Sequence, residues 1–216
     1  MKRDASSHAA AGISVGAIVA AALGVIRESG VEGLTMRSVA ERLEVRAPTL
    51  YHHVRNKGEL LELVARNAFD SFEADRAAFE KVETVGEWVE VTTAGALRLR
   101  EFYAGHPGLA RLIQAKATPY RDEGEGSRAA LVRAQLTALV RLGIPEPVAR
   151  SVFETTARWT MAAVAAEPAA AERPAVRGAA AVRPATDAGG EDLFADGLSY
   201  FLRGVQAHLE DVLSAG

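Results

Sequence analysis

Residues 33–57 read GLTMRSVAERLEVRAPTLYHHVRNK and carry the signals of two short helices. Thr35 is placed to cap the first helix, because a threonine oxygen can accept a hydrogen bond from an unpaired amide of the first turn. The step Glu44-Val45-Arg46 interrupts this helix. A second helix begins at Ala47-Pro48, where proline loses no hydrogen bond since that amide would be unpaired anyway. The stretch therefore predicts two helices joined by a short turn.

The second of these helices has few apolar side chains. Leu50 and Val54 lie together on a helical wheel and Ala47 lies near them, so the polar residues point elsewhere. Threonine, tyrosine, histidine and arginine side chains bond phosphate oxygens and base edges of DNA. The pattern favours an exposed recognition surface, although a solvated surface helix of an ordinary bundle would show the same spacing. The residues pointing away from the apolar side are Thr49, His52 and His53.

A longer helix precedes this stretch. Its apolar residues recur at helical spacing, Ser14 is placed as its N-cap, and Gly30 is placed to end it because glycine enters the left-handed conformation at little cost. Three helices joined in this way form the helix-turn-helix pattern. The stripe on the first helix consists of Ile18, Ala22, Val25 and Ile26.

The rest of the chain is also helical in pattern, with no run of period two that would indicate a strand. We therefore predict an all-α protein with an amino-terminal three-helix domain at 14–60 and a larger helical domain at 61–216. Residues 1–13 read as a flexible tail, and 167–191, rich in alanine, proline and glycine, as a mobile loop. The helices expected after the first three cover 57–72, 85–105, 107–115, 126–142, 145–166 and 192–213.

Composition narrows the class of protein. The 216 residues are 49% hydrophobic and 25% charged, which predicts a packed core. The absence of cysteine excludes a disulfide framework, a thiolate zinc site and a cysteine nucleophile. No membrane span or signal peptide is apparent, so a cytoplasmic location is expected. The net charge is −3, yet residues 35–57 contain five basic and two acidic residues, which concentrates positive charge near the predicted recognition surface.

Residues 14–66 resemble the DNA-binding domain of the TetR family. That domain typically reads G-x-T-x-R-x-[VL]-A at its second helix, then P-T-L-Y-x-H-[VF] and an N-K pair. The P-T-L-Y-x-H-V spelling is nearest to the tetracycline-repressor branch. The matching residues here are Gly33, Thr35, Arg37, Val39, Ala40, Pro48, Thr49, Leu50, Tyr51, His53, Val54, Asn56 and Lys57.

The resemblance implies roles at the DNA interface. Thr35 and Lys57 match positions that bind phosphates at helix amino ends, where exposed amides and the helix dipole favour anions. Arg37 matches a position that reaches a guanine in the tetracycline repressors. His52 stands where those repressors have tryptophan and Ala47 where they have glutamine, so their operator sequence does not transfer. The expected DNA-contacting residues are Thr35, Arg37, Ala47, Pro48, Thr49, Tyr51, His52, His53 and Lys57.

The resemblance also implies a function. We expect a homodimeric transcriptional repressor that binds a palindromic operator in double-stranded DNA and is released by a small-molecule effector. Residues 61–216 would bind the effector and form the dimer, with 145–166 and 192–213 building a four-helix bundle between subunits. The candidate effector contacts are Trp88, Phe102, Tyr103, His106, Leu112 and Trp159, and Met161 could line the same cavity.

A metal site is not expected. His106 falls where the metal-chelated drug touches a histidine in the tetracycline repressors, but Ala166 stands where their acidic partner is expected, with Glu167 adjacent. No cofactor or metal ligand is therefore predicted. The chain also has no H-E-x-x-H string, which leaves metallohydrolase chemistry without support.

Two other classes of function stay open. Residues 12–16 read GISVG, a G-x-S-x-G string that would make Ser14 the nucleophile of a serine hydrolase. In hydrolases such a string forms a sharp turn, the nucleophile elbow, which needs a buried strand directly before it. Only HAAA stands at 8–11, so we do not expect an enzyme. The chain could also be a helical protein-interaction module that does not bind DNA.

Overall fold

The computed structural model describes residues 13–116, 126–167 and 192–215, and in these ranges the regular structure is entirely helical, which confirms the all-α prediction. The predicted tail and mobile loop lie, apart from their end residues Ile13 and Glu167, outside the described ranges. The helices are α1 Val15–Ser29, α2 Met36–Arg42, α3 Ala47–Tyr51, α4 Lys57–Asn67, α5 Ala77–Glu80, α6 Val85–Ala104, α7 Leu109–Ala115, α8 Ser127–Arg141, α9 Glu146–Ala166 and α10 Leu193–Ala215, with a short 3-10 turn η1 at Ala68–Ser71.

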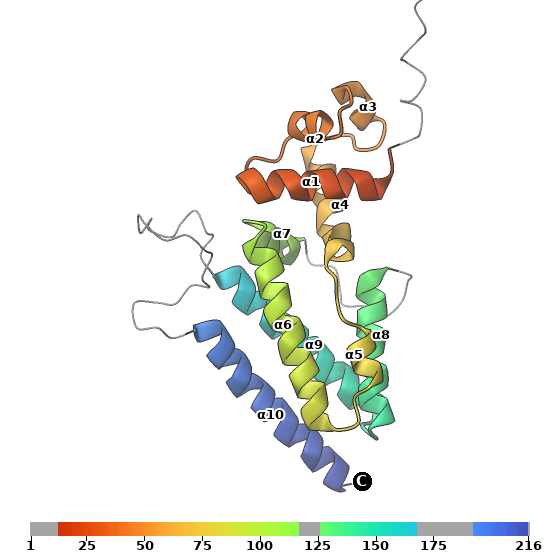
Figure 1. Ribbon diagram of the computed structural model, residues 1–216, viewed down its shortest axis with the longest axis vertical. Helices are drawn as coiled ribbons and strands as arrows, with labels where there is room; N and C mark the ends of the chain where they lie inside the picture. Colours follow the sequence, from red (N-terminus) through yellow and green to blue (C-terminus); the bar gives the residue numbers. More distant parts are fainter. Residues whose placement is uncertain (1–12, 117–125, 168–191, 216) are drawn as a thin grey trace, which may run out of the picture.

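Helices α1 to α3 form one end of the molecule, and α4 runs from them toward the body (Figure 1). The predicted ends of α1 are confirmed. The Ala17 amide donates to Ser14 Oγ at 3.1 Å, and Gly30 ends the helix with φ 68°. The positive φ suits glycine, which has no side chain to clash in the left-handed region. The apolar stripe of α1 is buried at Ile18, Ala22, Val25 and Ile26.

Helix α4 is shorter than its sequence pattern indicated. It ends at Asn67, whose Nδ2 donates to the Leu63 carbonyl at 2.7 Å, and the 3-10 turn η1 follows. Asp70 in that turn accepts the Ser127 amide at 3.0 Å and so caps the start of α8. A side chain that bonds a distant amide draws the backbone away from the regular helix. The short helix α5 was not predicted. Phe72, the last residue of the predicted 57–72 helix, is buried even though it lies beyond the end of α4.

The body consists of α6, α8, α9 and α10, whose facing sides form an apolar cluster around Trp88, Leu139 and Leu209. The predicted boundary at residue 60 falls inside α4, and buried residues of α1 belong to one apolar cluster with Leu109 of α7 and Leu202 of α10. The division into two domains therefore stays a prediction.

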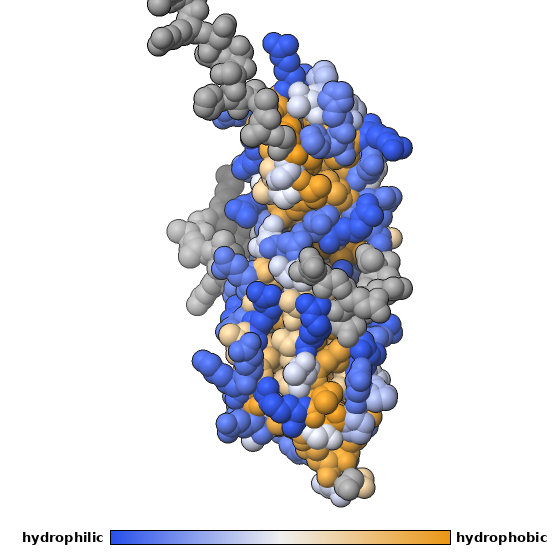
Figure 2. All heavy atoms as spheres, turned by 90° about the vertical axis from the view of Figure 1, so that its right-hand side faces the viewer, coloured by the Kyte–Doolittle hydropathy of each residue, from blue (hydrophilic) through white to orange (hydrophobic). Residues whose placement is uncertain are grey.

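The side of the molecule formed by α5 and α8 has a mixed surface. Figure 2 shows hydrophilic side chains along the whole length of this side, with apolar surface exposed between them toward the lower end. Among the described residues, no helix is both long enough and apolar enough to cross a lipid bilayer.

Candidate nucleic-acid interface and effector cavity

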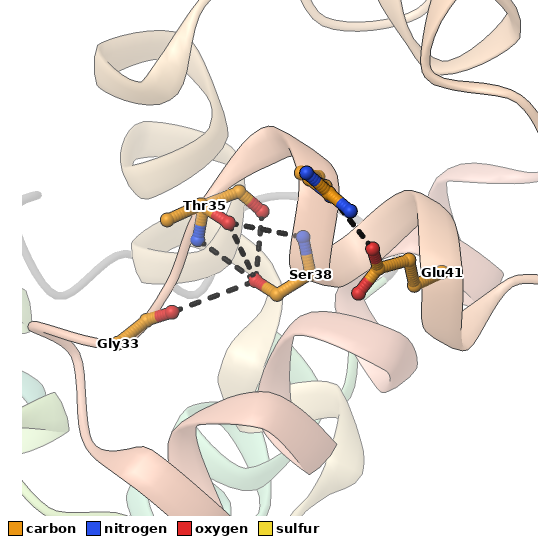
Figure 3. Close-up of polar contacts among 5 residues, drawn as sticks. Gly33, Thr35, Ser38 and Glu41 are labelled. Carbon is orange, nitrogen blue, oxygen red and sulfur yellow. Dashed lines mark hydrogen bonds and ion pairs between the residues drawn. The ribbon is translucent and has the colours of Figure 1, made fainter.

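The amino end of α2 is held by a reciprocal cap. The Ser38 amide donates to Thr35 Oγ1 at 3.0 Å, and the Thr35 amide donates to Ser38 Oγ at 2.9 Å (Figure 3). Both orphaned amides are satisfied without a carboxylate, so the helix start carries no negative charge of its own. Thr35 remains exposed at this end, where the helix dipole favours an anion.

The turn between α2 and α3 depends on one residue in the left-handed region. Glu44 has φ 56°, the only positive φ of a non-glycine residue in the described parts of the chain. The Val45 amide then donates to the Ala40 carbonyl at 3.0 Å and closes the end of α2. This turn directs α3 back across α2, so that α2 and α3 pack together.

Helix α3 has a buried side and an exposed side, as the sequence predicted. Leu50 is 0% exposed and Val54 is 1% exposed, which anchors the helix and the turn after it. The regular helix ends at Tyr51, but the Val54 amide still donates to the Leu50 carbonyl at 3.0 Å. Ala47 is half-buried beneath this surface. The exposed residues are Pro48, Thr49, Tyr51, His52 and His53.

The start of α4 combines a side-chain cap with an exposed lysine and a glutamate in the first turn. Asn56 caps the helix by accepting the Glu59 amide at 2.9 Å, and Glu59 in turn accepts the Arg55 amide at 2.6 Å. Lys57 is the first helical residue and is exposed. A cation at this point can meet a phosphate that also approaches the amino end of the helix.

Arg37 extends from the first turn of α2 into solvent. Its side chain is 86% exposed, and its Nε donates to Glu41 Oε1 at 2.8 Å (Figure 3). This hydrogen bond raises the pKa of Arg37 further above its ordinary value, so the guanidinium is charged at any pH of interest. The pair leaves the side chain extended rather than folded onto the protein.

Two supporting contacts had no signal in the sequence. Ser38 acts as the returning half of the cap, a position where glutamate or glutamine is the recognised pattern. Arg42 of α2 pairs with Glu28 of α1 at 2.7 Å. Its guanidinium passes over Gly24, where an added Cβ would stand 2.3 Å from Arg42 Nε. Gly24 thus leaves room for the Arg42 guanidinium in this position.

The body encloses a cavity of about 110 Å³ between α6, α8, α9 and the η1–α5 segment. Of the six predicted effector contacts, only Tyr103 lines it, together with Met161. The cavity wall is formed mainly by apolar and aromatic residues, which include Phe69, Phe72, Phe79, Leu99, Leu131 and Phe153.

The structure places the other five predicted contacts outside the cavity lining. Trp88 is fully buried in the apolar cluster of the body, and Leu112 packs on the cluster shared with α1. Trp159 stacks on Phe201 of α10 with ring centroids 5.4 Å apart. The remaining two, Phe102 and His106, lie together at the carboxyl end of α6, with ring centroids 4.5 Å apart.

His106 joins the body to α1. Its Nδ1 lies 2.6 Å from the Phe102 carbonyl, and its Nε2 lies 3.4 Å from a guanidinium nitrogen of Arg27. Next to it the Val31 amide donates to the Pro107 carbonyl at 3.0 Å. Burial lowers the pKa of His106 and the nearby Arg27 lowers it further, against the opposing effect of the Phe102 carbonyl. The His106 ring therefore sits at the contact between the end of α1 and the α6–α7 turn, where its burial disfavours the protonated form.

The alternatives from the sequence can be placed in the same way. Ser14 caps α1, and residues 8–11, where the strand of such an elbow would have to lie, are outside the described ranges. Gly12, the first residue of that string, lies outside the described ranges. Within those ranges no three histidine, aspartate or glutamate side chains gather as a metal site would require.

Comparisons with known proteins agree with this geometry. The family model described as "Bacterial regulatory proteins, tetR family" matches residues 18–64. The tetracycline repressor protein class E of Escherichia coli is 30% identical over 158 residues, which cover 73% of this chain and 70% of that protein. The class A repressor from transposon 1721 of Escherichia coli is 28% identical over 200 residues, which cover 87% of this chain and 88% of that protein.

A solved structure is also similar to this chain over most of its length. A singly substituted TetR from Acinetobacter baumannii AYE, in complex with minocycline, superposes with a TM-score of 0.65 at 25% identity, over 90% of this chain and 97% of that one. The resemblance found at residues 14–66 thus extends through α10. The chain belongs to the tetR family of bacterial regulatory proteins and is a TetR-family transcriptional regulator.

Proposed function

We propose that this regulator is a homodimeric repressor that binds a palindromic operator through α3 and releases it when a small molecule enters the body. The observation that carries the proposal is the exposed polar side of α3, held in place by fully buried Leu50 and Val54. Such a helix can enter the major groove while its anchors stay packed. The serine-hydrolase and interaction-module alternatives have no comparable observation in their favour.

The exposed residues divide into two roles. Thr35 and Lys57 stand at the amino ends of α2 and α4 and would bind phosphates on either side of α3. Arg37, extended beside Glu41, would reach a guanine edge with its guanidinium fork. The residues of α3 that would contact DNA are Ala47, Pro48, Thr49 and Tyr51, together with His52 and His53 in the turn that follows it.

A second copy of the chain would cover α9 and α10. Helix α9 exposes small side chains at Ser151, Thr155 and Ala162, which recur at helical spacing and allow close packing. Helix α10 exposes Leu193 and Tyr200, which are 64% and 67% exposed. Two helices from each subunit would form a four-helix bundle, and the pair of α3 helices would then read two half-sites one turn of DNA apart.

Release would follow from movement within the body. The contacts of His106 and Pro107 with the end of α1 connect the α6–α7 turn to the amino-terminal helices. A ligand that shifts α6 would alter the separation of the two α3 helices. To convert a population from 1:99 to 99:1, the ligand must favour the released state by about 5.5 kcal/mol.

The test measures binding to a palindromic fragment from the protein's own promoter region by fluorescence anisotropy at several salt concentrations. Tyr51→Ala and Lys57→Ala should each weaken binding without loss of helical content. Because a dimer carries two copies of Lys57, its removal should make the negative slope of log K against log salt shallower by about two. Lys81→Ala is the matched control, since Lys81 is also exposed but lies at the end of α5.

Four results would contradict the proposal. Unchanged affinity in both variants would remove α3 and α4 from the interface, and an equal loss in Lys81→Ala would show that only net charge matters. The oligomeric state is measured separately by sedimentation. A wild-type monomer at the concentrations that bind DNA, or a Tyr200→Asp variant that stays dimeric, would contradict the four-helix interface.

A further inference from the structure

The cavity in the body contains two hydroxyl groups with no hydrogen-bond partner. Thr92 of α6 is 7% exposed and Thr156 of α9 is 5% exposed, and both line the cavity. Neither Oγ1 atom has a partner within the protein. By contrast, Thr93, the neighbour of Thr92, donates its hydroxyl to the Val89 carbonyl at 2.8 Å. The two unpaired groups therefore stand on facing helices of the same cavity.

Buried hydroxyls without partners are rare, because a desolvated polar group that makes no hydrogen bond destabilises the fold. A helical threonine has an easy alternative, since its hydroxyl can bond the carbonyl four residues earlier, as Thr93 does. Thr92 and Thr156 both lack this bond, and both residues line the cavity. Their Oγ1 atoms are themselves buried, so rotation about the Cα–Cβ bond would bring each hydroxyl to the cavity surface, where a molecule that enters can be its partner.

The remaining wall restricts what that molecule can be. Phe69, Phe72, Phe79 and Phe153 line the cavity, so most of a ligand's surface must be apolar, and flat rings suit such walls. A volume of about 110 Å³ is smaller than the roughly 150 Å³ engineered cavity that admits benzene, so no more than one ring can enter without rearrangement. Residues of both charge signs, Asp75, Arg98 and Arg128, line the same cavity, so neither a cation nor an anion is favoured over a neutral ligand.

We propose that the effector of this regulator is a neutral single-ring aromatic compound with a hydroxyl or carbonyl group, and that Thr92 and Thr156 select it by hydrogen bonding to that group. The inference rests on the proposed function only in calling the bound compound an effector. Binding and selection of the compound can be measured without DNA. The two threonines are specificity residues, and the phenylalanine walls supply the apolar contact.

The test compares two probes of nearly equal shape, p-cresol and p-xylene, by calorimetric titration of the full chain. Wild-type protein should bind p-cresol about tenfold more tightly than p-xylene, the factor expected of about one well-made hydrogen bond. In the double variant Thr92→Val, Thr156→Val, which keeps side-chain shape, the ratio should fall to about one. Thr155→Val is the matched control, since Thr155 lies next to Thr156 but is exposed and outside the cavity lining.

A second measurement reports on the free protein. Because the two hydroxyls are unpaired, the double variant should have a thermal midpoint equal to or above that of the wild type. A lower midpoint would show that the hydroxyls are paired within the protein and would overturn the inference. So would equal affinity for the two probes in the wild type, or binding of neither at millimolar concentration.

The outcome separates this inference from the proposed function. If p-cresol is selected through the two threonines but does not release operator DNA, ligand recognition stands and the repressor mechanism fails. If operator DNA binds as proposed while the wild type does not discriminate between the probes, the regulator stands and the inference about its effector is wrong.

Discussion

Replacement of Arg100 by methionine tests a buried ion cluster that joins three helices. Arg100 of α6 bonds Glu167 after α9 through Nε at 2.8 Å, and Asp192 before α10 through Nη1 at 2.8 Å. Its side chain is only 9% exposed, and its guanidinium lies 4.8 Å from the ring centre of Phe194. One cation thus holds the end of α9 and the start of α10 against α6.

The size of the effect follows from burial. Removal of one partner from a fully buried ion pair costs about 3–5 kcal/mol, because the other charge is left unpaired. Here the two carboxylate side chains are 21% and 28% exposed, so water can partly solvate them once Arg100 is gone. We therefore expect Arg100→Met to lower the free energy of unfolding by about 2–3 kcal/mol. Methionine retains an apolar stem that can pack on Phe194.

The assay is urea unfolding followed by helical circular dichroism, at one fixed protein concentration. Arg37→Met is the control, because Arg37 pairs with Glu41 at 2.8 Å but its side chain is 86% exposed. Exposed pairs of this kind contribute little, because water screens both charges, so the control should leave stability nearly unchanged. Glu167→Gln added to Arg100→Met should restore part of the loss, because it removes an unpaired charge.

The same cluster sets a pH dependence. Burial by itself would raise the pKa of Asp192, but hydrogen bonds from Arg100 and from the Ala195 amide outweigh it and hold the pKa below its ordinary value. The contribution of the carboxylate is therefore complete above the unfolded pKa of about 3.9 and is lost as the pH falls through the lower folded value. Arg100→Met should make this acid loss shallower. Equal losses in Arg100→Met and Arg37→Met, or an unchanged acid profile, would refute the reasoning.

Three further predictions concern the amino-terminal half. Gly33→Ala should lower the thermal midpoint, because the new Cβ would stand 2.5 Å from Cβ of Ser29 and 2.8 Å from its carbonyl oxygen; an unchanged midpoint would contradict the clash. Ser38→Ala should cost about 1 kcal/mol in urea unfolding, because the Thr35 amide loses its acceptor Ser38 Oγ while the Ser38 amide still donates to Thr35 Oγ1; a neutral result would show that water replaces the lost bond. Because the pKa of His106 is lowered on folding, stability should fall as the pH drops from 7 to 5, and His106→Gln should flatten that profile; parallel profiles would assign the pH effect to other groups.

The helices that the sequence predicted correctly are those with local signals. Ser14, Gly30 and Thr35 end or begin helices through bonds to residues three or four positions away, and Leu50 and Val54 bury the inner side of α3 through helical spacing. These interactions depend on neighbours in the chain, so residue type and spacing are enough to place them. The DNA-binding end of the molecule could be recognised for the same reason.

The residues that line the cavity in the body could not be predicted from the sequence in the same way. Aromatic residues at helical spacing predicted contacts at Trp88 and Trp159, but the structure uses both as packing residues, one in the body core and one against α10. Tyr103 alone among the six lines the cavity, since a wheel shows which side of a helix is apolar but not which neighbour covers it.

The amino-acid sequence by itself determined most of the helices, the caps at Ser14, Gly30 and Thr35 and the exposed polar side of α3, because each arises from residues within one or two helical turns. The tertiary structure decided the rest. Arg100 bonds Glu167 and Asp192, which are 67 and 92 residues away in the chain. Thr92 and Thr156 line the same cavity. Such groups become neighbours only when α6, α9 and α10 pack, and burial, which gives them their energetic weight, does not exist in the unfolded chain.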